Sequence, residues 1–238
     1  MQTRLDITRR KGAGDKPYVL SVSFVTEDEN ATVATALTAI NADPTRRDIS
    51  GQPFEPISWE CSCLQKRCGA CAMVINGRPM LACDARLKEL SKNGTVTVEP
   101  LKKFPVVADL TVDREPMFAA LNELKLWLES EGAVKAQNTA LAFEASRCLQ
   151  CGCCLEICPN FYAGGKFFGT AAAVPTARVI AAAKDASEAA RGYKKHFYNG
   201  CGKSLACRNI CPAGIDIDAL LVNSNAAAVW KRHFGKAR

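Results

Sequence analysis

The sequence contains a run of cysteines that few folds can accommodate. Between Cys148 and Pro159 it reads Cys-Leu-Gln-Cys-Gly-Cys-Cys-Leu-Glu-Ile-Cys-Pro. Four of these cysteines follow the spacing C-x2-C-x2-C-x3-C-P: Cys148, Cys151, Cys154 and Cys158. This spacing is typical of bacterial ferredoxins, which bind a cubane iron–sulfur cluster with it. Two residues between cysteines allow a tight turn, which points several thiolates and backbone N–H groups at one anionic centre.

A degraded copy of the run lies downstream, at Cys201, Ser204, Cys207, Cys211 and Pro212. In two-cluster ferredoxins the fourth cysteine of each run binds the cluster of the other run. The pattern therefore predicts two interleaved ligand sets. The first set binds a four-iron cluster through Cys148, Cys151, Cys154 and Cys211. The second set consists of Cys158, Cys201 and Cys207.

Ser204 stands where the second set would have its fourth ligand. A serine hydroxyl is hard to deprotonate and is a poor ligand for a soft iron site. We therefore predict a three-iron cluster there, in preference to a four-iron cluster with the Ser204 oxygen bound. Disulfides and a zinc site are both disfavoured, because the thirteen cysteines follow no recognisable signal peptide and the ferredoxin spacing occurs twice.

A third group of cysteines lies in the first half of the chain. Cys63, Cys68 and Cys71 are spaced C-x4-C-x2-C, and Cys83 follows after eleven intervening residues. This is the plant-type pattern for a two-iron cluster. The fourth ligand follows a predicted hairpin over 72–81 with Asn-Gly at its turn. Two cysteines remain outside the three sets, as buried fillers or free thiols: Cys61 and Cys153.

Hydrophobic periodicity predicts a strand-rich first domain, 1–105, and a mostly helical second domain, 106–238. The first domain is a small mixed sheet with one helix across it, capped by Asn30, and it ends in a proline-bounded linker over 100–105. The predicted strands are 4–10, 17–26 and 95–98. In the second domain, the first predicted helix begins at Pro116. Three further helices are predicted over 138–147, 170–191 and 216–232.

The composition indicates a globular protein without a membrane span. Of the 238 residues, 48% are apolar and 23% are charged, and no stretch approaches the ~20 apolar residues that a span needs. We expect synthesis in the cytosol. The net charge of +7 is scattered without an aromatic-basic face, which argues against nucleic-acid binding. The basic end, 230–238, either lies near anionic lipid or is a solvated tail.

A plant-type two-iron pattern followed by four-iron and three-iron patterns resembles the iron–sulfur subunit of succinate dehydrogenases and fumarate reductases (respiratory complex II). The resemblance covers nearly the whole chain and includes the sequence Asp-Leu-Thr-Val-Asp-Arg over 109–114. It implies an α+β chain: a β-grasp plant-type ferredoxin domain, then an all-α bacterial-ferredoxin-like (alpha-helical ferredoxin) domain.

The same resemblance implies a function and partners. Single electrons would pass between the FAD of a flavoprotein subunit, where succinate and fumarate interconvert, and a quinone in a membrane anchor. The chemistry on the dicarboxylate belongs to the flavoprotein, so no catalytic residue is expected in this chain. The subunit would be peripheral, on the cytoplasmic face of the inner membrane.

Two departures from ubiquinone-using members indicate a branch within the family. The segment after Cys158, Pro-Asn-Phe-Tyr-Ala, lacks their tryptophans, and Gly202 stands where they have a histidine. Both argue against a quinone site on this subunit and favour menaquinone with a dihaem cytochrome b anchor. The rival functions are an iron–sulfur subunit of another flavin-linked oxidoreductase (thiol:fumarate reductase or glycolate/glycerol-phosphate oxidase type) and a free-standing ferredoxin. Ser204 and the positive charge disfavour them.

Overall fold

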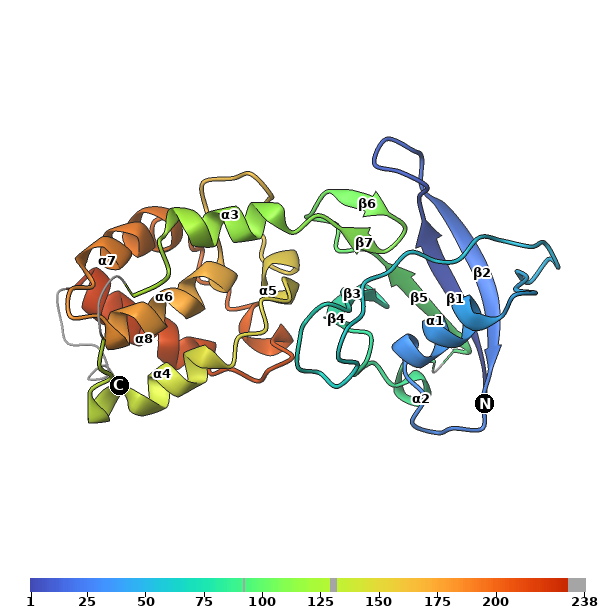
Figure 1. Ribbon diagram of the computed structural model, residues 1–238, viewed down its shortest axis with the longest axis horizontal. Helices are drawn as coiled ribbons and strands as arrows, with labels where there is room; N and C mark the ends of the chain where they lie inside the picture. The colour runs from blue at the N-terminus through green and yellow to red at the C-terminus, as the bar shows by residue number, and fades with distance from the viewer. Residues whose placement is uncertain (92, 129–131, 231–238) are drawn as a thin grey trace. The chain divides into compact units, whose positions relative to one another are not determined.

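The structure is a computed structural model, and it describes residues 1–91, 93–128 and 132–230 (Figure 1). It consists of two compact units, Met1–Asp113 and Arg114–Arg238. A sheet unit followed by a helical unit confirms the predicted order. The division falls after Asp113, whereas the linker pattern predicted it after Pro105. The basic end beyond Trp230 lies outside the described residues.

The first unit is built on a five-stranded sheet in the order β2-β1-β5-β3-β4. β1 pairs antiparallel with β2 and parallel with β5, and β3 pairs antiparallel with both β4 and β5. Asn76 and Gly77 have φ of +48° and +76°, as a tight β3–β4 turn requires. The strands are β1 (Gln2–Arg9), β2 (Tyr18–Val25), β3 (Ala72–Ile75), β4 (Arg78–Leu81) and β5 (Thr95–Glu99).

Two helices complete this unit, α1 (Val33–Ala42) and the short α2 (Leu87–Leu90). The buried face of α1 includes Val33, Leu37 and Ile40, as predicted. The predicted cap at Asn30 is wrong. Thr32 caps α1 through a reciprocal pair of hydrogen bonds with Thr35, and its Oγ1 accepts from the Thr35 N–H at 3.2 Å.

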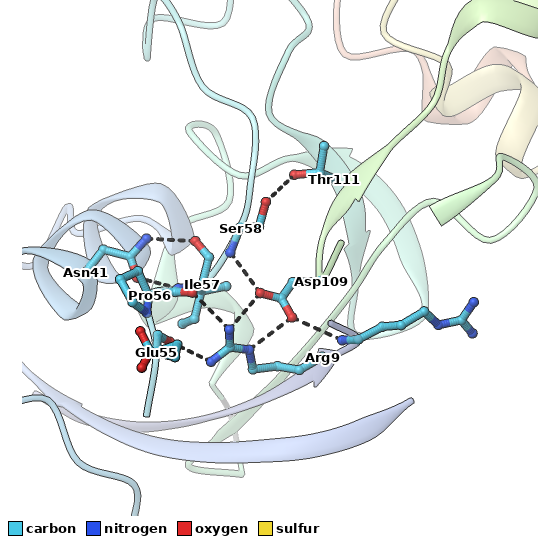
Figure 2. A network of polar contacts seen from close by, with 9 residues as sticks. Arg9, Asn41, Glu55, Pro56, Ile57, Ser58, Asp109 and Thr111 are labelled. Atoms are coloured by element: carbon cyan, nitrogen blue, oxygen red, sulfur yellow. Dashed lines mark hydrogen bonds and ion pairs between the residues drawn. The ribbon is translucent and has the colours of Figure 1, made fainter. Parts of the chain in front are cut away.

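An unpredicted hairpin, β6 (Val106–Ala108) and β7 (Thr111–Val112), ties the predicted linker to the first unit. Figure 2 shows how. Strand alternation turns Arg9 inward, where its side chain is only 6% exposed and makes a two-pronged ion pair with Asp109, at 3.0 and 2.7 Å. The Arg9 guanidinium also donates to the carbonyls of Glu55 and Pro56. The Ser58 N–H donates to Asp109 at 2.9 Å. This buried network places the domain boundary after the hairpin.

The second unit is helical and contains a buried core of alanine, leucine, isoleucine and aromatic side chains. The predicted helix over 170–191 is interrupted at Ala183, where the chain becomes extended. Its α-helices are α3 (Glu115–Glu123), α4 (Thr139–Ser146), α5 (Cys153–Glu156), α6 (Thr170–Ala182), α7 (Ser187–Tyr193) and α8 (Ile217–Ala228). Short helical segments are η1 (Ala136–Asn138), η2 (Lys194–Tyr198) and η3 (Arg208–Ile210).

The helical packing of this unit brings the two cysteine runs to the ends of short elements. Cys153 and Cys154 begin α5, and Cys207 and Cys211 flank η3. α5 contacts both α6 and η3, so the first cysteine run lies beside the second. Within the described residues, none of the helices is both long enough and apolar enough to cross a membrane.

Candidate iron–sulfur cluster sites

The loop before β3 brings together the four cysteines of the plant-type pattern. Leu64 and Lys66 have φ of +52° and +58°, which is rare for residues with a side chain. This backbone points N–H groups at sulfur. The Lys66 N–H lies 3.3 Å from Cys83 Sγ, and the N–H groups of Gln65 and Arg67 lie 3.3 Å from Cys63 Sγ. Strain of this kind concentrates at functional sites, where it shapes a binding loop.

The thiols of this loop differ in how readily they ionise. The N–H groups of Gln65 and Arg67 lower the pKa of Cys63 to about 7. Burial raises the pKa of Cys71 to about 12, with a smaller contribution from the neighbouring Cys83 and Cys68 thiols. These interactions place Cys71 beside Cys83 and Cys68. Metal binding at such thiols displaces their protons, so site assembly is coupled to proton release.

The second unit brings together the first three cysteines of one run with the last cysteine of the other. Burial raises the pKa of Cys148 to about 11, and the nearby Cys151 and Cys211 thiols act in the same direction. Burial likewise raises the pKa of Cys154, with contributions from neighbours that again include Cys211. Gln150 and Gly152 adopt the left-handed conformation between these cysteines, with φ of +51° and +85°. Thiols from both cysteine runs therefore lie near one another, and the assignment of Cys211 to the four-iron set stays a prediction.

Three further cysteines and Ser204 line a small concavity together: Cys158, Cys201 and Cys207. Burial raises the pKa of Cys207, and the Cys158 and Cys201 thiols add to this, whereas a hydrogen bond from the Thr170 side chain lowers it. Lys203 and Leu205, on either side of Ser204, have φ of +56° and +55°. The loop that would carry a fourth ligand is therefore present, with an oxygen in place of a sulfur.

The two cysteines outside the sets differ from each other. Cys61 is exposed, whereas Cys153 is fully buried and its thiol hydrogen-bonds to Cys151, lowering the pKa of Cys151 to about 7. All thirteen cysteines lie in the described part of the chain, and none of them forms a disulfide. Across the described ranges, no group of three or more His, Cys, Asp or Glu side chains is arranged to hold a metal ion.

Several polar groups around the cysteines have no signature in the sequence. Gln150 Nε2 lies 3.3 Å from Cys148 Sγ. The Thr170 side chain hydrogen-bonds to Cys207 and acts to lower its pKa. The positive charge of Arg178 acts to lower the pKa of Cys148. Thr170 and Arg178 lie on α6, so spacing within the cysteine runs could not identify them. The thiols, the converging N–H groups and the left-handed turns fit anionic iron–sulfur clusters.

Comparisons with known proteins give the same order of iron–sulfur domains. A family model described as a 2Fe-2S iron-sulfur cluster binding domain matches residues 4–119, and one described as a 4Fe-4S dicluster domain matches residues 144–215. The succinate dehydrogenase iron-sulfur subunit of Bacillus subtilis is 33% identical to the chain, and the match covers 99% of this chain and 97% of that protein. The fumarate reductase iron-sulfur subunit of Wolinella succinogenes is 27% identical over 71% of this chain and 76% of its own length.

A solved structure, the Mycobacterium smegmatis Sdh1 complex in the apo form, contains a chain with the same fold. The superposition has a TM-score of 0.73 at 19% sequence identity. It covers 97% of this chain and 96% of that chain. At 19% identity, this similarity supports a shared fold and nothing about function.

Proposed function

Because the chain belongs to the family of succinate dehydrogenase and fumarate reductase iron–sulfur subunits, we propose how its cysteines transfer electrons for that enzyme. The chain is the electron-transfer subunit of such a complex, with a 2Fe-2S domain followed by a 4Fe-4S dicluster domain. It works with a flavoprotein and a membrane anchor. The observation that carries this conclusion is the one-third identity to a succinate dehydrogenase iron-sulfur subunit over almost the full length of both chains.

Eleven cysteines are the proposed ligands, in three sets. A two-iron cluster is held by Cys63, Cys68, Cys71 and Cys83. A four-iron cluster is held by Cys148, Cys151, Cys154 and Cys211. A three-iron cluster is held by Cys158, Cys201 and Cys207. The proposed fold names are a β-grasp ferredoxin domain and an alpha-helical ferredoxin domain.

Each part of the chain has a distinct task in this proposal. When bound, iron–sulfur clusters accept and release one electron at a time. The backbone N–H groups beside Cys63 and Cys83 stabilise negative charge at the two-iron site. Burial of Cys151 and its neighbour Cys153 would limit the access of water to the four-iron site. The chain itself holds no residue that acts on the dicarboxylate.

We also propose which cofactors and which type of membrane anchor the partner subunits contribute. Electrons pass between the covalent FAD of the flavoprotein and menaquinone in a dihaem cytochrome b anchor, on the cytoplasmic face of the inner membrane. Gly202 beside Cys201, and the absence of tryptophan after Cys158, support a quinone site on the anchor and none on this subunit. Purification from membranes through a tag on this chain tests the proposal. Flavoprotein, anchor and menaquinone should co-purify, and recovery of a lone chain with intact clusters would refute it.

Ser204→Cys is expected to convert the three-iron cluster to a four-iron cluster, because it supplies the missing soft ligand. The EPR signal of the oxidised three-iron cluster should then disappear, and the iron content should rise by about one atom per chain. Ser204→Ala is the matched control and should keep the three-iron signal, because the hydroxyl is not a ligand. Loss of the signal in Ser204→Ala would instead indicate that the serine oxygen binds iron.

A further inference from the structure

Gln150 lies between two proposed ligands of the four-iron cluster, and its side-chain amide points at one of them. Gln150 Nε2 is 3.3 Å from Cys148 Sγ and 3.3 Å from the carbonyl oxygen of Ala171. The left-handed backbone of Gln150, with φ of +51°, belongs to the turn that holds the cysteines. The side chain thus joins the cysteine run to the first turn of α6.

The two contacts determine which end of the amide faces the sulfur. The Ala171 carbonyl oxygen accepts hydrogen bonds, as does the Cys148 sulfur once it is a thiolate ligand, so the NH2 group must face them. Gln150 Oε1 is buried and has no hydrogen-bond partner in the described part of the chain. A buried acceptor without a partner is unfavourable. The unpaired Oε1 accompanies an orientation in which the NH2 group reaches the sulfur of a proposed ligand.

A proline in α6 explains why the Ala171 carbonyl accepts this hydrogen bond. Pro175 lies inside α6, four residues after Ala171. Proline has no N–H, so the Ala171 oxygen lacks its usual helical donor. The Gln150 amide supplies a donor in its place. This second hydrogen bond anchors the side chain while its other N–H points at Cys148.

We propose that Gln150 raises the reduction potential of the four-iron cluster by donating a hydrogen bond to the Cys148 sulfur. The inference rests on the proposed function, in which Cys148 is a cluster ligand. Reduction adds one electron and therefore negative charge, which spreads over the ligand sulfurs. An N–H···S hydrogen bond stabilises the reduced state more than the oxidised state, since its acceptor becomes more negative. Gln150 is a positioning and tuning residue and takes no part in the chemistry on the substrate.

The test is an EPR-monitored redox titration of the purified complex carrying Gln150→Met or Gln150→Glu. Methionine keeps the side-chain length but donates no hydrogen bond. At the wild-type midpoint, the ratio of oxidised to reduced four-iron cluster should rise about fivefold, which is about 40 mV for a one-electron couple. Glutamate should lower the potential further, because it adds a negative charge. The two-iron and three-iron midpoints should stay unchanged.

Gln137→Met is the matched control, because Gln137 is an exposed glutamine of the same unit, and all three midpoints should remain at their wild-type values. An unchanged or raised four-iron potential in the Gln150 variants would overturn the inference while leaving the proposed function intact. Loss of the four-iron cluster from both variants would assign Gln150 a structural role and also overturn it. Absence of a four-iron signal in the wild-type complex would refute the proposed function itself.

Discussion

Cys211→Ala is expected to remove the four-iron cluster, although Cys211 belongs to the second cysteine run. The Cys211 thiol lies near enough to Cys148 and Cys154 to contribute to the raised pKa of both. Iron binding requires a complete set of soft ligands, and metal sites of this kind contribute folding free energy as well as chemistry. Because even outer-shell changes at metal sites cost about 10- to 100-fold in activity, loss of a ligand should lower succinate:quinone electron transfer at least about 100-fold. EPR of the reduced complex measures the four-iron cluster directly.

Two control variants make this result specific. Cys158→Ala should abolish the three-iron signal and keep the four-iron signal, although Cys158 belongs to the first run. Cys153→Ala removes a buried cysteine that is not a proposed ligand, and it should keep both signals. If Cys211→Ala removes the three-iron signal and leaves the four-iron signal, each run binds its own cluster and the interleaved sets are wrong.

Asp109→Ala is expected to destabilise the first unit by about 3–5 kcal/mol, because it leaves the Arg9 guanidinium buried without its counter-charge. Both side chains are only 6% exposed. The change also removes the acceptor of the Ser58 N–H, so the hairpin over 106–112 loses one of its attachments to the first unit. Chemical unfolding of the purified complex, followed through absorbance of the two-iron cluster, measures the loss.

The double variant Arg9→Met/Asp109→Leu separates charge from packing. It removes both charges together and should destabilise the unit less than Asp109→Ala alone. Glu29→Ala is the surface control: Glu29 pairs with Lys88 at 2.9 Å, but both side chains are exposed, so the unfolding midpoint should not change measurably. A double variant less stable than the single variant would show that the buried pair itself stabilises this region.

The two iron–sulfur domains could be predicted from the sequence because cluster geometry imposes a strict cysteine spacing, whereas the three ligand sets stay predictions. The predicted interleaving of Cys211 with the first run follows from the same rule, although Cys148 and Cys211 lie 63 positions apart. Amphipathic patterns likewise located β1, α1 and α8 to within a few residues, since each element buries one face. These features depend on short-range pattern or on the chemistry of iron.

Features that depend on distant partners could not be predicted. Arg9 and Asp109 are 100 positions apart, and neither residue alone signals a buried ion pair. The hairpin over 106–112 therefore looked like the start of the second domain. Thr32 and Asn30 are both good helix caps, and only the position of Thr35 decides between them. The contact of Gln150 with Cys148 depends on a free carbonyl in α6, which no spacing within the run reveals.

The most direct test of the account is EPR spectroscopy, with iron analysis, on the complex purified through a tag on this chain. We expect about nine iron atoms per chain and three distinct signals: a three-iron signal in the oxidised protein, and two-iron and four-iron signals on reduction. Zinc in place of iron, disulfides between the cysteines of a proposed set, or a complex without the three-iron signal would contradict it.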